Sequence, residues 1–401
     1  MVVAMAAMGA GAAGTRGRQV PPPAVPQATA GGYNCSARPN NVTVVEVVAT
    51  SAYDAGFQLG RASASRVAAF LALPDVAAAV AYAASGAGAA LSASMLAVTQ
   101  AAMPRWVEEM AGLADGAGVA RGVIVAVNQL AELQTVAPPA ATSSPPATHC
   151  TDILLAAGAP WLAHNEDNEV GDADIMFLAR VNYTAAAGGL TNYTAYMYPG
   201  QLATTAFGFN AAGLYLSQNA VFPTITNASG IPAEVLSRSI INATSLADAL
   251  ALLTSTPAAG GSSFNLGHVA DATGLFNVEI SPFGVTSVLP VPTPAPAPAD
   301  YYFHVNMYRH TPVPQVPDTS SIARLARLQA MPPPTSPADL RAMLGDTANA
   351  TWPIYRNGSE PDAVMTLMTA LFTGAAGAGT MTLYANNPKY CPPFMTLPIA
   401  A

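Results

Sequence analysis

A proline-rich segment at residues 138–146 divides this sequence into two parts with different patterns of apolar residues. Residues 52–133, which precede it, repeat apolar side chains at helical spacing. Gly116 and Gly118 within this range are expected to end a helix. Prolines lack an amide donor and hold the chain extended. The segment therefore predicts an exposed connector that follows a mainly helical part.

The sequence after this connector alternates strand-like and helical runs. Helices are expected at residues 232–254, where Ser245 can cap the second half, and at residues 320–330 and 337–344. Two further proline-rich tracts, residues 21–26 and 290–298, are interpreted as connectors. Strands are expected at residues 152–156, 161–164, 175–181, 193–198, 214–217, 264–269, 275–280, 302–306 and 380–384.

This order of elements predicts the fold class. Helices, strands, helices and strands follow one another without strict βαβ alternation, and several strands are separated only by turn signals. Such an order favours an α+β fold in which two antiparallel sheets pack together with helices outside. The length of 401 residues allows one large domain or two ordinary ones.

Charge and hydropathy exclude two classes of partner. Only 9% of residues are charged, the net charge is -8, and the single lysine is Lys389, so no basic cluster exists for nucleic acid to bind. The uncharged run at residues 76–104 is mostly Ala, Gly and Ser, which gain little from leaving water. We expect a buried helix there and no membrane span.

Eight asparagines start an N-x-[ST] triplet with no proline in the middle, where chance gives roughly three. The excess favours secretion or a lumenal compartment such as the endomembrane system or vacuole, although residues 1–30 form only a weak signal peptide. Accidental triplets in a chain rich in Ser and Thr are the alternative. The predicted glycosylation sites are Asn34, Asn41, Asn182, Asn192, Asn227, Asn242, Asn349 and Asn357.

The three cysteines cannot all pair with one another. In an oxidising compartment Cys35 and Cys391, which lie near the termini, can form a disulfide and leave Cys150 as a free thiol. A thiol kept free there is either reactive or deeply buried, and an inert buried cysteine is the alternative to a nucleophile.

A nucleophilic Cys150 needs a base, because only the thiolate attacks and a free thiol has a pKa of about 8.5. None of the five histidines stands in a papain-type or caspase-type signature, although a Cys-His pair formed only in the fold stays open. A cut just before Cys150 would instead create an α-amino group, with a pKa of about 8, that takes the thiol proton. The histidines are His149, His164, His268, His304 and His310.

Two motifs point to a known family. Cys150-Thr151-Asp152 begins one expected strand, and residues 161–168, with the sequence WLAHNEDN, lie on the next. Together they resemble the cysteine N-terminal-nucleophile (Ntn) family of penicillin acyltransferases, which also includes carcinine and β-alanyl-dopamine hydrolases. The resemblance implies a four-layer αββα sandwich of two antiparallel sheets. It extends over residues 108–118 with Asn128 and Glu132, residues 208–214 leading to Asn219, residues 230–232 entering the Arg238 helix, residues 265–282 and residues 304–306.

The same resemblance implies roles for individual residues. Cys150 would be the nucleophile, Asp167 would hold the freed α-amino group, and Asn219 would donate to the oxyanion. Asn306 would orient the amine or the substrate. A solvated turn for Asp167 and strand-end amides for the two asparagines are the alternatives. Further positioning roles are expected for Thr151, Asp152 and Asn165.

The residue before the expected cut departs from the family pattern. His149 stands where glycine is common in penicillin acyltransferases. His149 could assist the N-to-S acyl shift, or an external protease could cut the proline-rich linker first. An arginine for a substrate carboxylate has no position that the sequence assigns.

We therefore expect a signal or disordered segment at residues 1–30, a helical pro-region at residues 31–149 and a catalytic chain at residues 150–401, which pack as one domain and form a heterodimer after cleavage. The expected activity is hydrolysis or transfer of the acyl group of a small N-acyl amine, amide or amino acid, for example β-alanyl or fatty-acyl, through a thioester and without cofactor or metal. The alternatives are an inert secreted glycoprotein with this fold and a thiol hydrolase that uses His304 or another histidine without cleavage.

Overall fold

The structure is a computed structural model that describes residues 29–30, 33–35, 42–137, 150–271, 274–294, 299–358 and 364–400. The predicted N-terminal segment, apart from β1 (Thr29–Ala30), lies outside these residues. So do the proline-rich segment at residues 138–146, the residue His149 and the predicted glycosylation site Asn41. Strand β1 pairs with β2 (Tyr33–Asn34) as a separate two-stranded sheet.

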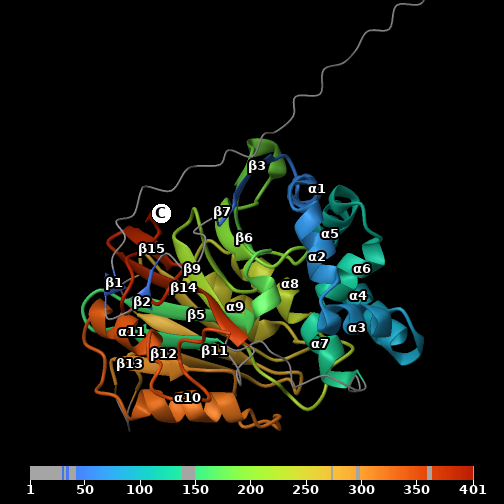
Figure 1. Cartoon of the computed structure of the whole chain (residues 1–401). Helices are drawn as coiled ribbons and strands as arrows, with labels where there is room; N and C mark the ends of the chain where they lie inside the picture. The colour runs from blue at the N-terminus through green and yellow to red at the C-terminus, as the bar shows by residue number, and fades with distance from the viewer. Residues whose placement is uncertain are drawn as a thin grey trace, which may run out of the picture.

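Two larger sheets form the body of the molecule (Figure 1). One has six strands in the order β13 (Tyr301–His304), β4 (Thr151–Leu155), β5 (Trp161–Glu169), β14 (Val364–Ala375), β15 (Ala378–Tyr384) and β16 (Met395–Ala400). The other has eight, in the order β12 (Thr286–Val291), β11 (Leu275–Ile280), β10 (Ser262–His268), β9 (Leu214–Ala220), β8 (Phe207–Asn210), β7 (Tyr193–Met197), β6 (Phe177–Tyr183) and β3 (Val44–Ala49).

Strand pairing in both sheets is antiparallel with one exception. The edge strand β3 pairs with β6 in parallel, because the chain passes through the N-terminal helices between the two strands. The antiparallel prediction is therefore correct for every other pair within these two sheets.

Helices cover both outer faces. The N-terminal ones are α1 (Ala52–Ala62), α2 (Ala64–Leu71), α3 (Pro74–Ala83), α4 (Gly86–Ala102), α5 (Pro104–Ala117), α6 (Arg121–Val127) and α7 (Leu130–Val136). They lie together on one side of the molecule (Figure 1). The later ones are α8 (Ala233–Ile240), α9 (Leu246–Ser255), α10 (Thr319–Gln329) and α11 (Pro337–Leu344), and two 3-10 turns are η1 (Val170–Asp172) and η2 (Ala185–Ala187).

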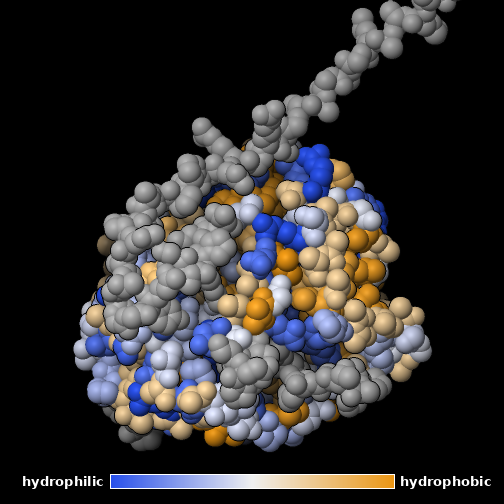
Figure 2. Space-filling model, viewed as in Figure 1, coloured by the Kyte–Doolittle hydropathy of each residue, from blue (hydrophilic) through white to orange (hydrophobic). Residues whose placement is uncertain are grey.

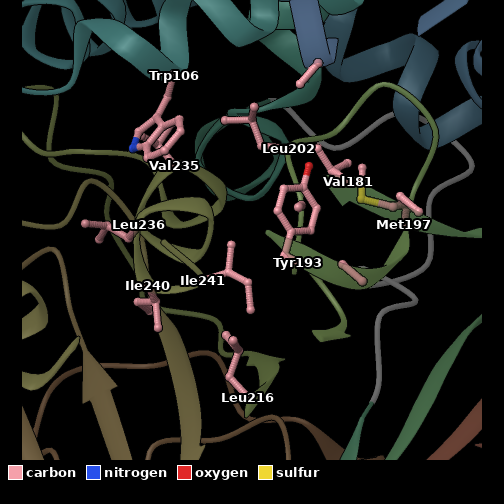
Figure 3. Packing of buried hydrophobic residues seen from close by; sticks show 14 of the residues in the cluster. Trp106, Val181, Tyr193, Met197, Leu202, Leu216, Val235, Leu236, Ile240 and Ile241 are labelled. Atoms are coloured by element: carbon pink, nitrogen blue, oxygen red, sulfur yellow. The ribbon is translucent and has the colours of Figure 1, made fainter. Parts of the chain in front are cut away.

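Three apolar clusters mark the interfaces between four layers. The first joins the N-terminal helices, α8 and α9 to the eight-stranded sheet, and Figure 3 shows Val235 of α8 beside Trp106 of α5. The second lies between the two sheets and includes Leu162 of the six-stranded one. The third packs the six-stranded sheet against α10 and α11. The αββα prediction is confirmed, and β4 is buried along its whole length because both its faces are covered.

Close contact between α1 and α5 depends on glycine. A Cβ atom added to Gly56 would stand 2.1 Å from the carbonyl oxygen of Glu109, and one added to Gly112 would stand 2.1 Å from that of Tyr53. No side chain fits at such distances, so the two backbones touch directly. This contact fixes where α5 presents its other side chains to the sheet.

Several expected elements differ from the observed ones. The single helix expected at residues 232–254 is two helices, since the chain breaks before Ser245, whose side chain caps α9 by accepting from the amide of Asp248. In the two larger sheets, strands β3, β8, β12, β14 and β16 lie outside the expected strand ranges. Strand β12 contains Pro290 at the start of the tract interpreted as a connector.

The uncharged run at residues 76–104 is not one buried helix but parts of α3 and α4, and α4 buries only one face. Among the described residues, no single helix is long and apolar enough to cross a membrane. Two consecutive pairs, α2 with α3 and α5 with α6, reach that length and composition only together, and they are bent by 84° and 120°. Figure 2 shows apolar residues spread over the side of the molecule that these helices form, as an alanine-rich composition predicts.

Candidate active site

Cys150 stands just before β4 with its backbone held from two sides. The residue is 3% exposed and its thiol is free. Its nitrogen donates to Oδ1 of Asn306 over 2.8 Å, and its carbonyl oxygen accepts from the guanidinium of Arg324 over 2.6 Å. Arg324 also donates to Oγ1 of Thr151 at 2.7 Å and to Oδ1 of Asn306 at 2.8 Å. The position of the Cys150 nitrogen is therefore fixed by a buried polar cluster.

The thiol itself faces negative charge. Its Sγ lies 3.8 Å from Oε2 of Glu166. Burial raises the pKa of the Cys150 thiol well above its usual value, and the neighbouring carboxylates, first that of Glu166, add to the shift. The thiol is therefore protonated in this arrangement, and chemistry at sulfur requires a proton acceptor.

His164 lies beside the thiol between two carboxylates. Its Nδ1 is 2.9 Å from Oδ1 of Asp152, directly opposite it in the β4–β5 hairpin, and its Nε2 is 2.9 Å from Oε2 of Glu166. Burial lowers the pKa of His164, but Asp152 and Glu166 outweigh burial and raise this pKa to about 10. The ring is therefore an imidazolium at neutral pH. Tyr198 completes the row by donating to Oε1 of Glu166 at 2.5 Å.

Asp167 is fully buried on β5, and neither of its carboxylate oxygens has a hydrogen-bond donor among the described residues. Burial raises its pKa to about 7, although the cations of Arg356 and Arg324 act in the opposite direction. Burial and the neighbouring Arg356 lower the pKa of Arg324 to about 10, so this guanidinium stays charged at neutral pH. A buried carboxylate without a donor beside fixed cations is able to hold an ammonium group.

The two predicted asparagines have different partners. Oδ1 of Asn219 accepts from Asn265 at 3.1 Å, while its Nδ2 is buried and has no acceptor among the described residues. The side chain of Asn306 is occupied at both ends, because its Nδ2 donates to the carbonyl of Ala220 at 3.0 Å. Asn306 thus connects the nitrogen of Cys150, at the start of β4, to Ala220, at the end of β9. Only Asn219 retains a free amide donor.

The three predicted positioning residues lie in different surroundings. Thr151 contacts Arg324, and Asp152 orients His164 while accepting from the hydroxyl of Ser217. Asn165 points away, since its amide donates to the carbonyls of Leu344 and Ile354 and its Oδ1 accepts from the hydroxyl of Thr369. The structure therefore brings two of the three to the site, and Asn165 instead anchors the α11 layer.

The remaining histidines bear on the alternative without cleavage. Nε2 of His304 lies 3.0 Å from Glu279, whose carboxylate also accepts from the backbone amides of Arg309 and His310. His304 is thus bound to an acid of β11, and the imidazole next to the thiol is that of His164. His149 lies outside the described residues.

Three residues of the site were not expected from the sequence. Arg324 lies on the buried side of α10 with Ser321 and Leu328, and a cation within that helical stripe is the signal that could have revealed it. Glu166 becomes a neighbour of the thiol only through the pairing of β4 with β5, and Tyr198, which follows β7, reaches Glu166 because the two large sheets pack against each other. No sequence pattern indicates that proximity.

The structure also shows how the cysteines pair and how exposed the predicted glycosylation sites are. Cys35 and Cys391 form a disulfide with their Cα atoms 5.4 Å apart. Asn357 is exposed and Asn349 is half-buried, as are the other described sites for which a side chain is placed, namely Asn182, Asn192, Asn227 and Asn242. Attachment of glycans is not tested by this geometry.

The chain has relatives among known proteins. A curated relative, a β-alanyl-dopamine/carcinine hydrolase from Drosophila melanogaster, is 26% identical over 368 residues, which cover 86% of this chain and 94% of the relative. A solved structure, penicillin V acylase from Agrobacterium tumefaciens, is 13% identical and covers 58% of this chain and 82% of its own, with a TM-score of 0.28 that is too low to bear on the fold.

A family model, acyl-coenzyme A:6-aminopenicillanic acid acyl-transferase, matches residues 155–390. The match begins just after Cys150 and spans Asp167, Asn219, Asn306 and Arg324. It covers more than half of the 401 residues. The chain belongs to the acyl-coenzyme A:6-aminopenicillanic acid acyl-transferase family.

Proposed function

We propose that the chain is a precursor that is cut between His149 and Cys150 and then acts as a cysteine amide hydrolase or N-acyltransferase. The observation that carries the proposal is the setting of the Cys150 nitrogen, 2.8 Å from Oδ1 of Asn306. After scission this nitrogen is an α-amine in a prepared site, with Arg324 holding the Cys150 carbonyl. Asp167, with its free buried carboxylate, is the counter-charge for the ammonium form.

The reaction follows from these groups. The α-amine takes the thiol proton, and the thiolate attacks the amide carbonyl of the substrate. Asn219 donates through its free Nδ2 to the oxyanion of the tetrahedral intermediate. The α-ammonium returns a proton to the leaving amine, which departs and leaves a thioester on Cys150. Water, or an acceptor amine in the transferase reaction, then releases the acyl group.

A buried carboxyl group near the site is suited to a substrate with a cationic group, which would draw the carboxyl into its ionised form on binding. Asp172 lies on η1, which continues directly from β5, and it is 2% exposed with one carboxylate oxygen unbonded among the described residues. Burial raises the pKa of Asp172 to about 8, and the carboxylates of Asp75 and Glu169 add to the shift. The Drosophila relative is named for β-alanyl-dopamine and carcinine. We therefore place β-alanyl amines, whose acyl part carries an ammonium group, ahead of fatty-acyl amines and N-acyl amino acids.

A secreted or lumenal address belongs to the same proposal. The disulfide between Cys35 and Cys391 requires oxidising conditions in most organisms, and the eight glycosylation triplets agree with such a compartment. Reactive Cys150 is then the one thiol left reduced.

N-terminal sequencing of the purified protein after reduction tests the maturation step. We expect two polypeptides, one of which begins with Cys150, and we expect Cys150→Ala to remain a single uncut chain. A fully active protein that stays intact would contradict the proposal. That result would favour a second candidate, a thiol hydrolase that needs no cleavage, in which the pair formed by Glu166 and His164 beside the sulfur takes the thiol proton.

Asn219→Ala is expected to lower kcat/KM for an N-acyl amine by about 10²–10³-fold, as loss of one oxyanion donor does in other acyl-transfer enzymes. The matched control is Asn165→Ala, which removes an equally buried amide that contacts Leu344, Ile354 and Thr369. The control should reduce the melting temperature more than the rate. Equal rates for Asn219→Ala and the parent protein would remove Asn219 from the mechanism.

A further inference from the structure

Three side chains that can ligate a metal ion converge at the thiol. Sγ of Cys150, Nε2 of His164 and Oε2 of Glu166 all lie within 4.8 Å of one another. The separation from Oε2 is 3.8 Å for the sulfur and 2.9 Å for the nitrogen. Thiolate, imidazole and carboxylate are the donors that Zn²⁺ takes in proteins, and its bond lengths put tetrahedral donors roughly 3–4 Å apart. The cluster thus has the composition of a zinc site, and its donors are close enough to reach one ion after a small closure of the side chains.

The groups behind these donors are arranged as they are around bound zinc. A zinc-bound histidine nearly always donates its other ring N–H to a carboxylate, a backbone carbonyl or water. Here Nδ1 of His164 lies 2.9 and 3.0 Å from the two oxygens of Asp152, which is itself held by Ser217. Tyr198 binds Oε1 of Glu166 and leaves Oε2 toward the sulfur. Both donors are therefore oriented before any ion arrives.

Metal binding takes its ligands in their deprotonated forms, so the thiol and the imidazole release their protons to solvent as the bonds to the ion form. The neighbouring charged groups are Asp167 of β5, Arg324 of α10 and Arg356.

We propose that Cys150, His164 and Glu166 form a Zn²⁺ site and that its occupation reversibly blocks the thiol. The ion takes three protein ligands and leaves a fourth position for water. Zn²⁺ is an inhibitor in this role, because the sulfur that it binds is the atom proposed to attack the substrate. The assignment depends only on a free thiol, so it holds whether or not the chain is cut before Cys150.

The test measures metal binding rather than activity, using the purified full protein and Co²⁺ as a spectroscopic probe for Zn²⁺. We expect one Co²⁺ per chain with a thiolate-to-cobalt charge-transfer band, displacement by Zn²⁺, and no such band in Cys150→Ala. His164→Gln and Glu166→Gln should each weaken Zn²⁺ binding by at least about 100-fold, and Asp152→Asn by about 10–100-fold. His268→Asn, which removes a histidine whose Nδ1 accepts from the amide of Ala270, is the matched control and should bind as the parent does.

Thiol labelling tests Zn²⁺ binding at Cys150 without any substitution. Zn²⁺ should slow alkylation of Cys150 by iodoacetamide, and a chelator should restore the original rate. The proposal is overturned if Cys150→Ala binds Zn²⁺ as tightly as the parent, if a folded His164→Gln protein keeps the parent affinity, or if Zn²⁺ leaves the labelling rate unchanged. Loss of Zn²⁺ binding in all three ligand variants, with His268→Asn unaffected, supports it.

Discussion

Cys150→Ala is expected to lower kcat/KM for an N-acyl amine by on the order of 10⁴–10⁶-fold, the range found when a covalent nucleophile is removed. The effect is large because no thioester can form without the sulfur. The fold should be unchanged, because the contacts to Asn306 and Arg324 use the backbone nitrogen and carbonyl of Cys150. Steady-state hydrolysis of a β-alanyl amine and of a fatty-acyl amine gives the measurement.

Cys150→Ser distinguishes loss of the nucleophilic sulfur from a disturbance of side-chain packing. Serine keeps a hydroxyl at the same place, but its oxygen is a far weaker nucleophile without an activating base. We expect its activity to lie between those of the parent and the alanine variant, with a melting temperature equal to that of the parent. An alanine variant that retains activity within about tenfold of the parent, well short of a nucleophile's contribution, would place the attacking group elsewhere.

Glu109→Ala is expected to destabilise the protein by about 3–5 kcal/mol, because it leaves the guanidinium of Arg238 buried without its counter-charge. Arg238 is fully buried, and its Nε donates to both oxygens of Glu109 at 3.0 Å. Its guanidinium carbon lies 4.0 Å from the ring centre of Trp106 and 4.8 Å from that of Tyr193. Burial lowers the pKa of Arg238, but Glu109 outweighs burial and raises it, so the substitution removes the group that compensates the buried charge.

Denaturant unfolding monitored by intrinsic fluorescence gives the free energy of unfolding for this variant. The control is Glu46→Ala, which breaks the exposed pair of Glu46 with Arg180 at 2.7 Å. An exposed pair contributes up to about 1 kcal/mol. If the two variants lose the same free energy, Glu109 does not compensate a buried charge. The pair matters for assembly, since Glu109 belongs to the predicted pro-region and Arg238 to the predicted catalytic chain.

The layers of the fold could be predicted from the sequence, whereas their edges could not. Alternation of apolar residues revealed most strands of the eight-stranded sheet, and helical spacing revealed α10 and α11 closely. Strand β14 was not predicted because it is buried on both faces, so its apolar residues do not alternate with polar ones, and its threonines recur at intervals of three and four residues, which resembles helical spacing. Strand β12 was not predicted because it contains Pro290, and proline is usually absent from strands since it has no amide donor. The strand is possible here because β12 lies at the edge of its sheet.

The site was predictable only as far as motifs and local spacing reach. Cys150 and Asp167 stand on one hairpin, so the sequence distance between them carries information. Arg324, 174 residues from Cys150, meets it because α10 packs over β4. The contact of Glu166 with the sulfur depends on which face of β5 each residue occupies, and polar residues on both faces of this strand hide that alternation.

The disulfide between Cys35 and Cys391 bears on what scission before Cys150 would produce. It joins a residue near the start of the predicted pro-region to one near the end of the predicted catalytic chain, 356 positions apart. Two polypeptides linked in this way meet as an intramolecular event, at an effective concentration that does not fall when the sample is diluted. An extracellular enzyme built in this way would keep its two polypeptides paired at any dilution. Only a reductant that breaks the disulfide would allow them to separate.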